Sequence, residues 1–303
     1  MPRERFGDGH AFLPRRAYLS FEEIQKVVDA CKPLGLEKVR ITGGEPLLRP
    51  NLDELIAILK SSGVEVALTT NASLLSGQAE KLAEAGLDRV TVSLDALDPK
   101  IHAEMTDSSI PVEAVLEGIE AAVRAGLSPV KVNCVVQKGV NEDQVVPLVE
   151  RFRGTDVTVR FIEYMDVGRT NGWQLGQVVP SADILKFLQE RFELIQVDAT
   201  NPSDVAKRWA HSDGSGEVGF ISSVSEPFCG DCVRARVSAD GRLHTCLFAS
   251  GGHELRAIID SEEEQTLSDA ISAIWSRRDD RYSEIRSLET SVLPRVEMSY
   301  IGG

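Results

Sequence analysis

Three of the five cysteines in this sequence, Cys229, Cys232 and Cys246, lie close together in its last third. A Cys-x-x-Cys pair lets two thiolates converge on one metal centre, and an Asp-Gly turn signal brings the third cysteine back toward them. Three thiolates suit a [4Fe–4S] cluster with one open iron, although four cysteines are the usual set. A structural zinc site usually has four protein ligands, and only His244 is near enough to complete one. Spacing alone favours the cluster and leaves zinc, or a redox or structural role, open.

Two arginines, Arg234 and Arg236, stand between the second and third cysteines. Residues two apart in a strand face the same side, and we expect a strand over residues 234–237. Two guanidinium groups on one face hold phosphate oxygens through charge-assisted bidentate hydrogen bonds. The alternative is a solvated strand face. We favour phosphate binding because the cysteines fix the orientation of that face.

Further polar groups follow the ends of other strand patterns. The segment Arg40-Ile-Thr-Gly-Gly-Glu-Pro46 ends the first of them, and its glycines let a ligand approach bare backbone. A tight turn between strand and helix is the alternative. Later strand patterns carry Thr69, Ser93, Lys131, Arg160, Glu163 and Met165. Since ligands of parallel α/β folds bind beyond the carboxyl ends of strands, we expect these residues to form one polar, cationic rim.

Strand and helix patterns alternate through the first two thirds of the chain. We expect strands over residues 37–42, 64–69, 89–94, 130–136 and 157–164. We expect helices from a capping box at Ser20 toward Gly35, and over residues 51–60, 78–85, 112–125, 142–152 and 182–192. This alternation predicts an α/β fold with a parallel sheet. Periodicity does not choose between a doubly wound sheet and part of a barrel.

The pattern changes after residue 200. Residues 201–216 are polar and glycine-rich, which indicates a loop or linker. Strands are expected over residues 218–223 and 234–237, then 243–246 after the Asp-Gly turn, and a helix over residues 263–275. We therefore divide the chain into a barrel-like unit, residues 1–200, and an extension, residues 201–303.

Composition limits the classes of partner. The chain has 303 residues and a formal net charge of -14, which disfavours binding to nucleic acid or to an anionic membrane. No run of about 18 apolar residues is present, and we expect a cytoplasmic protein. Cys31 and Cys134 lie in a helical and a strand pattern, and we interpret both as buried structural thiols.

The order of the motifs resembles one known family. It comprises Arg-Ile-Thr-Gly-Gly-Glu-Pro-Leu, Leu-Thr-Thr-Asn, Val-Ser-Leu-Asp-Ala, Val-Lys-Val-Asn, Arg-Phe-Ile-Glu-Tyr-Met-Asp-Val-Gly, Phe-Cys-x-x-Cys-x-Arg-x-Arg, Asp-Gly-x-Leu-x-x-Cys-Leu-Phe and a terminal Gly-Gly. This order, spanning the whole chain, resembles the GTP 3′,8-cyclase family (molybdenum cofactor biosynthesis protein A) of the radical SAM superfamily. Gly-Gly-Glu-Pro is shared across that superfamily, whereas the arginine-containing cysteine motif and the Gly-Gly tail are specific to the family.

The resemblance implies a fold and roles for particular residues. The fold would be a partial TIM-like barrel with a C-terminal extension carrying a [4Fe–4S] cluster on Cys229, Cys232 and Cys246. The open iron of that cluster would bind the guanine of GTP. The GTP site would use Arg40, Thr69, Lys131, Arg160, Arg234 and Arg236, and S-adenosylmethionine would lie against Gly44, Ser93 and Met165. Arg234, Arg236, Gly302 and Gly303 would be the catalytic residues, the two glycines as part of a tail that reaches the active site.

One departure from the family pattern concerns the start of the chain. The family's N-terminal Cys-x-x-x-Cys-x-x-Cys, which holds a second [4Fe–4S] cluster, and the first barrel strand are absent from the printed sequence. A misplaced start codon or a shortened, non-catalytic paralogue that binds GTP and one cluster would each explain this. We favour the misplaced start, because the other motifs are intact.

The resemblance also implies a reaction. With S-adenosylmethionine, a lyase of this family converts GTP to (8S)-3′,8-cyclo-7,8-dihydroguanosine 5′-triphosphate in molybdenum cofactor (molybdopterin) biosynthesis. Its expected partners are an electron donor and cyclic pyranopterin monophosphate synthase, and the family also admits a homodimer.

Overall fold

Two sheets form the framework of the molecule. The computed structural model describes residues 13–167, 172–199, 204–230, 232–261, 264–286 and 295–301. Within them, a large sheet runs in the order β1-β2-β3-β4-β5-β8-β7-β6 and a small one in the order β11-β10-β9. The strands are β1 Lys38–Ile41, β2 Glu65–Thr70, β3 Arg89–Ser93, β4 Val130–Val136, β5 Val157–Glu163, β6 Leu194–Val197, β7 Lys207–His211, β8 Glu217–Ile221, β9 Arg236–Val237, β10 Arg242–His244 and β11 His253–Glu254.

Most of the helices connect successive strands. They are α2 Phe21–Cys31, α3 Leu52–Ser61, α4 Ala79–Glu84, α5 Pro99–Thr106, α6 Val112–Arg124, α7 Val145–Phe152, α8 Ser181–Gln189, α9 Arg256–Ile259, α10 Glu264–Ser276, α11 Tyr282–Ile285 and α12 Met298–Ile301. The six helices expected in the first two thirds of the chain are all present. Helix α5 was not predicted, although Asp98, which caps it, and Pro99 at its first position are ordinary signals of a helix start.

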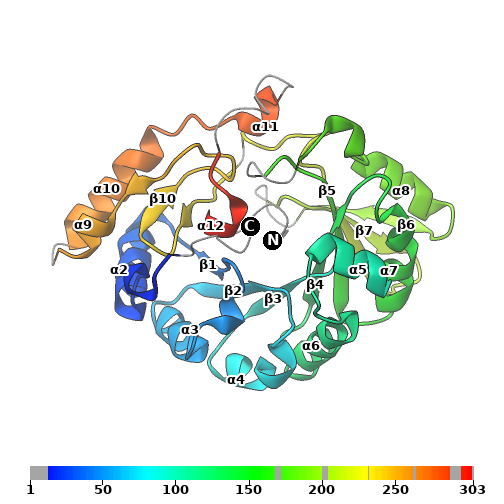
Figure 1. Ribbon diagram of the computed structural model, residues 1–303, viewed down its shortest axis with the longest axis horizontal. Coiled ribbons are helices and arrows are strands. Elements are labelled where there is room, and N and C mark those ends of the chain that lie inside the picture. Colours follow the sequence, from blue (N-terminus) through cyan, green and yellow to red (C-terminus); the bar gives the residue numbers. More distant parts are fainter. Residues whose placement is uncertain are drawn as a thin grey trace.

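The large sheet is a partial barrel. Neighbouring strands from β1 to β5, and β8 beside β5, are parallel, whereas β7 and β6 continue the sheet antiparallel. Figure 1 shows the strands along an open arc, with α3, α4 and α6 on its outer side and α12 inside. The structure therefore confirms the α/β class and selects the partial TIM-like barrel over the doubly wound sheet.

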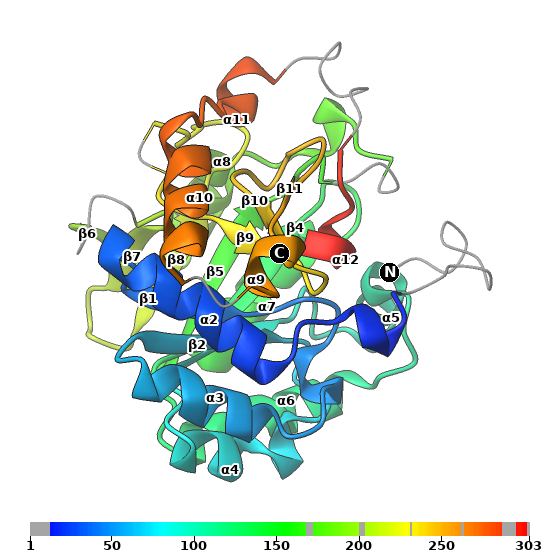
Figure 2. The ribbon, with the colours of Figure 1, turned by 90° about the vertical axis from the view of Figure 1, so that its left-hand side faces the viewer.

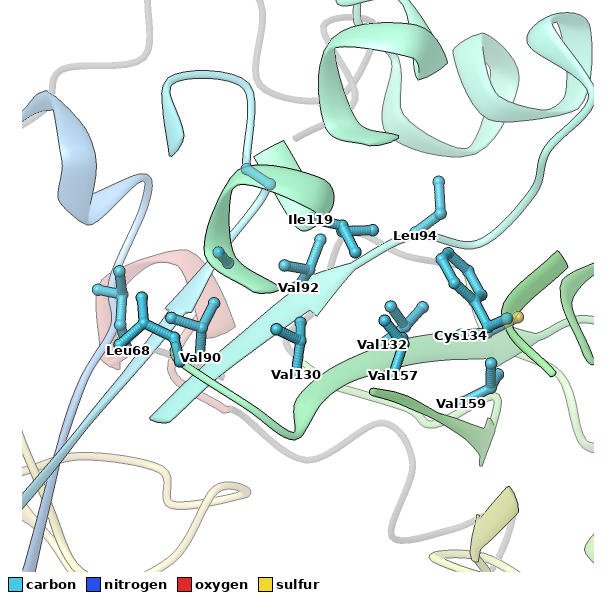
Figure 3. Close-up of a cluster of buried hydrophobic side chains, with 14 of the residues drawn as sticks. Leu68, Val90, Val92, Leu94, Ile119, Val130, Val132, Cys134, Val157 and Val159 are labelled. Atoms are coloured by element: carbon cyan, nitrogen blue, oxygen red, sulfur yellow. The ribbon is translucent and has the colours of Figure 1, made fainter. Parts of the chain in front are cut away.

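The main hydrophobic core lies between the outer face of the sheet and its helices. Side chains of alternate residues on neighbouring strands point into it, as Leu68, Val90 and Val132 do (Figure 3). Each of these three is fully buried. Alternation therefore leaves the residues between them on the inner face of the arc.

A second, smaller core joins the start of the described chain to its C-terminal part. Val27 of α2, Ile259 of α9 and Ile271 of α10 are all buried in it. Figure 2 shows α2, α9 and α10 side by side. The predicted capping box begins α2, since the Glu23 backbone N–H donates to Ser20 Oγ and the Ser20 N–H donates to the Glu23 carboxylate.

Two local expectations require correction. Residues 201–216 do not form only a loop, because β7 lies within them and pairs with β6 and β8. The strand expected from residue 234 begins only at Arg236, since the preceding residues belong to the turn of the cysteine pair, where the Cys232 N–H donates to the Cys229 carbonyl. The Asp-Gly hairpin between β9 and β10 is confirmed.

Two remaining expectations concern single features. None of the described helices is long and apolar enough to cross a membrane. Cys134 is fully buried and Cys31 half-buried, and burial raises the pKa of Cys31 to about 11.

Candidate functional site

The inner face of the arc carries two rows of polar side chains. In the first row, Thr69 of β2 is in register with Thr91 of β3, which is in register with Lys131 of β4. In the second row, Asn133 of β4 lies between Ser93 and Arg160. Parallel register therefore brings these six polar residues from four neighbouring strands onto one surface.

Hydrogen bonds fix two guanidinium groups on this surface. Arg40 of β1 donates from one Nη to Thr69 Oγ1 at 3.0 Å and to Thr91 Oγ1 at 3.1 Å. Arg160 donates from Nε to Asn133 Oδ1 at 2.9 Å. Both arginines are thus held by neutral partners, which orient their charge without cancelling it.

The cations of the inner face lie close enough together that each disfavours the charged form of its neighbours. Burial, with the charges of Arg160, Arg89, Arg40 and Lys38, lowers the pKa of Lys131 to about 8. Burial and the charge of Arg40 lower the pKa of Arg160 to about 10. Such crowding of like charges stabilises a bound polyanion.

The β9–β10 hairpin contributes its own cations to the same region. Burial lowers the pKa of Arg40, the charge of Glu65 opposes this shift, and the charges of Arg89 and Arg234 add to it. Burial and the charge of Arg234 also lower the pKa of Arg236. The arginines between the cysteines therefore belong with the cations of the sheet.

The three cysteines lie near these arginines. One Nη of Arg234 donates to Cys232 Sγ at 3.5 Å. Burial acts to raise the pKa of Cys232, but the charge and hydrogen bonds of Arg234 outweigh it and leave the pKa below its ordinary value. Burial raises the pKa of Cys246, and interactions with Asp280 and Cys229 act in the same direction. Cys246 therefore interacts with Cys229, and both Cys232 and Cys246 interact with Arg236.

This donor set fits an iron–sulfur cluster. The Phe248 backbone N–H donates to Cys246 Sγ at 3.4 Å, the kind of hydrogen bond that cluster thiolates accept. His244, the only fourth ligand considered for zinc, is buried in an edge-on contact with the Tyr300 ring. Among the residues that the structure describes, no three His, Cys, Asp or Glu side chains already converge in metal-binding geometry. The fit therefore rests on the chemistry and proximity of the thiols.

The residues expected at the S-adenosylmethionine site lie at three strand ends. Ser93 ends β3 and is exposed, and Met165 is half-buried two residues after β5. Gly44 is exposed, and no atom lies within 4 Å of the place where a Cβ would stand. The adjacent Glu45 holds this turn to the end of β2, since its carboxylate accepts from Thr70 Oγ1 at 2.7 Å and from the Asn71 N–H at 2.8 Å.

Glu163, at the end of β5, fixes the segment that leads to the cysteines. Its carboxylate accepts hydrogen bonds from the N–H groups of Ser181, Val224 and Ser225 at 2.7–2.8 Å. Burial acts to raise its pKa, but the hydrogen bonds from Ser225, Ser181 and Val224 outweigh it and hold the pKa below its ordinary value. An ionised carboxylate thus joins the barrel rim to the extension.

Several residues of this surface were not predicted from the sequence. Thr91 and Asn133 orient the arginines, and Lys38 and Arg89 contribute charge. The period-two pattern of polar residues within each strand was the signal that could have found them. Gly302 and Gly303 lie outside the described residues.

Two family patterns together match most of the chain. The pattern described as the Radical SAM superfamily matches residues 6–152. The pattern described as Molybdenum Cofactor Synthesis C matches residues 157–284. The first covers β1 to β4 of the cationic inner face, and the second covers the hairpin with its cysteines.

Relatives align with the whole chain. A protein named GTP 3′,8-cyclase from Xanthomonas axonopodis pv. citri (strain 306) is 51% identical to it, over 100% of this chain and 91% of the relative. Proteins of the same name from Acidothermus cellulolyticus (strain ATCC 43068 / DSM 8971 / 11B) and Staphylococcus aureus (strain bovine RF122 / ET3-1) are 45% and 43% identical, with the same coverage.

Proposed function

We propose that this chain, which belongs to the GTP 3′,8-cyclase family of the radical SAM superfamily, binds GTP and S-adenosylmethionine and forms 3′,8-cyclo-7,8-dihydroguanosine 5′-triphosphate from GTP. The observation that carries this proposal is the set of oriented cations on the inner face, where Thr69 and Thr91 hold Arg40 and Asn133 holds Arg160. This surface is crowded with positive charge. A nucleotide triphosphate supplies the negative charge that would balance it.

Cations of the inner face bind the triphosphate in this proposal. Arg40, Lys131 and Arg160 contact it from the sheet, and Arg234 and Arg236 contact it from the hairpin, with the Thr69 hydroxyl orienting Arg40. Guanidinium groups already oriented by threonine and asparagine lose little freedom on binding. They therefore hold the ribose and base of GTP in a fixed position, which is the main contribution of this surface to the reaction.

Cys229, Cys232 and Cys246 would hold a [4Fe–4S] cluster whose open iron receives the guanine. Gly44, Ser93 and Met165 would hold S-adenosylmethionine, which in this family supplies a radical when a second, reduced [4Fe–4S] cluster is bound, and the cysteines of that second cluster are absent from the printed sequence. Arg234 and Arg236 act as catalytic residues by holding the nucleotide while C3′ joins C8, and Gly302 and Gly303 are proposed to complete the site. A low-potential electron donor and cyclic pyranopterin monophosphate synthase, which takes the product, are the proposed partners.

The nucleotide site is tested by Arg234→Ala in anaerobically reconstituted protein. Loss of a charge-assisted contact to phosphate is expected to weaken GTP binding about tenfold or more, with iron and sulfide content unchanged. Equilibrium dialysis with GTP measures the first and metal analysis the second. The control is Arg151→Ala, which removes an arginine paired with Glu120 on the outer helices. Equal GTP affinity in the Arg234 and Arg151 variants would remove Arg234 from the site.

The reaction is tested separately in protein that carries the family's N-terminal Cys-x-x-x-Cys-x-x-Cys ahead of this chain, with S-adenosylmethionine, GTP and a reductant, and with both products followed by mass spectrometry. The proposal expects 5′-deoxyadenosine and the cyclised nucleotide in equal amounts. Tight GTP binding with neither product would instead support a nucleotide- and cluster-binding protein without catalysis.

A further inference from the structure

A buried polar cluster lies outside the cationic inner face, and its residues contact neither GTP nor S-adenosylmethionine in the function proposed above. Its centre is Asp166, three residues after β5 and 2% exposed. The Asp166 carboxylate accepts from Arg286 Nε at 2.8 Å, from Arg295 at 2.9 Å and from the Tyr282 hydroxyl at 2.5 Å. The side chains of both arginines are at most 6% exposed.

Burial of two guanidinium groups against one carboxylate is costly. Hydrophobic residues of similar volume often stabilise a protein as well as such a group or better, so stability alone does not account for it. A buried charged cluster does fix the geometry of the segments that meet in it. Here these segments are the end of β5, α11 with Arg286 after it, and the stretch that begins at Arg295.

Aromatic contacts connect this cluster to the third cysteine. The Phe248 ring stacks on the Tyr282 ring, with 4.7 Å between centroids and 27° between planes. The Arg286 guanidinium carbon lies 5.1 Å from the centre of the Phe248 ring. The backbone N–H of the same Phe248 donates to Cys246 Sγ at 3.4 Å. Each step from Asp166 to the sulfur is thus a direct contact.

A second attachment holds the same loop. Val296 follows Arg295, and Ala249 follows Phe248. The Val296 N–H donates to the Ala249 carbonyl at 3.0 Å. Arg286 also donates to the Ser223 carbonyl at 2.8 Å, at the start of the segment that leads to Cys229. The cluster therefore contacts both segments that carry the cysteines.

We propose that Asp166 and Arg286 are positioning residues for Cys246, and that they hold Phe248 so that its backbone N–H donates to the cysteine sulfur. The inference rests on the proposed role of Cys246 as a cluster ligand. Hydrogen bonds to cluster sulfurs, like nearby charge, set the reduction potential of an iron–sulfur centre. They stabilise the more negative, reduced state. Asp166 and Arg286 thus tune the cluster without touching it.

Three variants test the proposal in the full chain, reconstituted without oxygen. Arg286→Lys keeps the charge but loses the planar group over Phe248, Phe248→Leu removes the ring and keeps the N–H, and Tyr282→Phe removes only the hydroxyl on Asp166. All three are expected to keep the iron and sulfide content. Arg286→Lys and Phe248→Leu should lower the reduction potential of the C-terminal cluster and broaden its electron paramagnetic resonance signal. Tyr282→Phe should cause a smaller shift in the same direction.

The matched control is Arg208→Lys, which makes the same chemical change in an arginine bonded at 2.8 and 2.9 Å to Glu217 on β8. It should leave potential and signal unchanged. Thermal unfolding followed by circular dichroism identifies any variant that fails to fold.

The outcomes separate this inference from the function on which it rests. Unaltered protein that binds no iron would overturn the proposed cluster and this inference with it. A cluster whose potential and signal are unchanged in Arg286→Lys and Phe248→Leu would overturn the positioning role alone. An equal shift in Arg208→Lys would do the same, because the effect would then follow from any loss of an arginine contact.

Discussion

At the scale of single residues, the inner face is defined by cations whose partners are neutral. Arg40 is held by two threonine hydroxyls and Arg160 by an asparagine carbonyl. Glu65 is the acidic exception, bridging Lys38 at 3.2 Å and Arg89 at 2.8 Å near the start of the strands. Charge repulsion between oriented cations stores free energy that a bound polyanion releases, so protonation of this face should control nucleotide affinity.

The pKa of Lys131 sets the pH range over which GTP affinity should change. Its pKa is lowered to about 8, so the free protein loses this charge as the pH rises through 8. A bound triphosphate favours the charged form, and binding above this pH must therefore take up a proton. GTP affinity should fall about tenfold between pH 7 and pH 9, since the protonated fraction of a group with that pKa falls by this factor.

Calorimetric titrations in two buffers of different ionisation enthalpy measure the affinity and the proton uptake together. Lys131→Arg, which stays charged throughout, is the control and should bind GTP with little change over this range. A similar fall in affinity in the Lys131→Arg variant would assign the pH dependence to another group.

At the scale of elements, carboxylates at strand ends join one segment to the next. Glu45 ties the turn after β1 to the end of β2, and Glu163 ties the end of β5 to α8 and to residues 224–225. Each accepts backbone N–H groups that have no partner in a regular strand or helix. These loops, which carry or flank the site residues, are therefore ordered by side chains rather than by sheet pairing.

Glu163→Gln tests this arrangement. The amide keeps the shape but places an N–H₂ against donors, which leaves buried groups unsatisfied and should lower the free energy of unfolding by about 2 kcal/mol. Because hydrogen bonds hold the Glu163 pKa below its ordinary value, its stabilising effect is present above that ordinary value and is lost as the pH falls through the folded-state pKa. The variant should therefore lose less stability in acid than the parent protein.

Urea unfolding at neutral and acidic pH measures both effects. Glu226→Gln, an exposed carboxylate of the same segment paired with Lys207, is the control and should change stability by less than about 0.5 kcal/mol. Equal losses in the two variants would contradict a special role for Glu163.

At the scale of the whole molecule, the large sheet continues past residue 200. β8 lies beside β5 in parallel register, with Phe161 opposite Phe220, and both side chains are in the main core. The division at residue 200 proposed from the sequence lies between β6 and β7, which are paired in this sheet. The strands on the two sides of that division share one hydrophobic core.

Hydrogen exchange tests whether those strands open together. The amides of β5 and β8 should exchange with opening free energies that agree within about 1 kcal/mol, because neither strand can leave without exposing the other. The short strand β11, with exposed side chains, should exchange faster and serves as an internal reference. Exchange of β8 several kcal/mol more easily than β5 would indicate two separately folding units.

The sequence by itself determined the order of alternating helices and strands as far as α8, apart from α5. The strand at residues 130–136 and the capping box of α2 depend on residues close in the chain, and the structure has both where they were predicted. The family followed from the order of short motifs. These signals depend on residues close together in the sequence, so they can be recognised before the fold is known.

Only the tertiary structure decided which residues meet. That Arg234 acts on Arg40, that Asn133 holds Arg160 and that Asp166 is linked through Phe248 to Cys246 depends on strand register and on packing between distant segments. β7 was missed for the same reason, since its pairing with β6 and β8 outweighs a polar composition typical of a loop. Contacts of this kind depend on how burial and hydrogen bonding are satisfied over the whole sheet, and no short stretch of sequence specifies that.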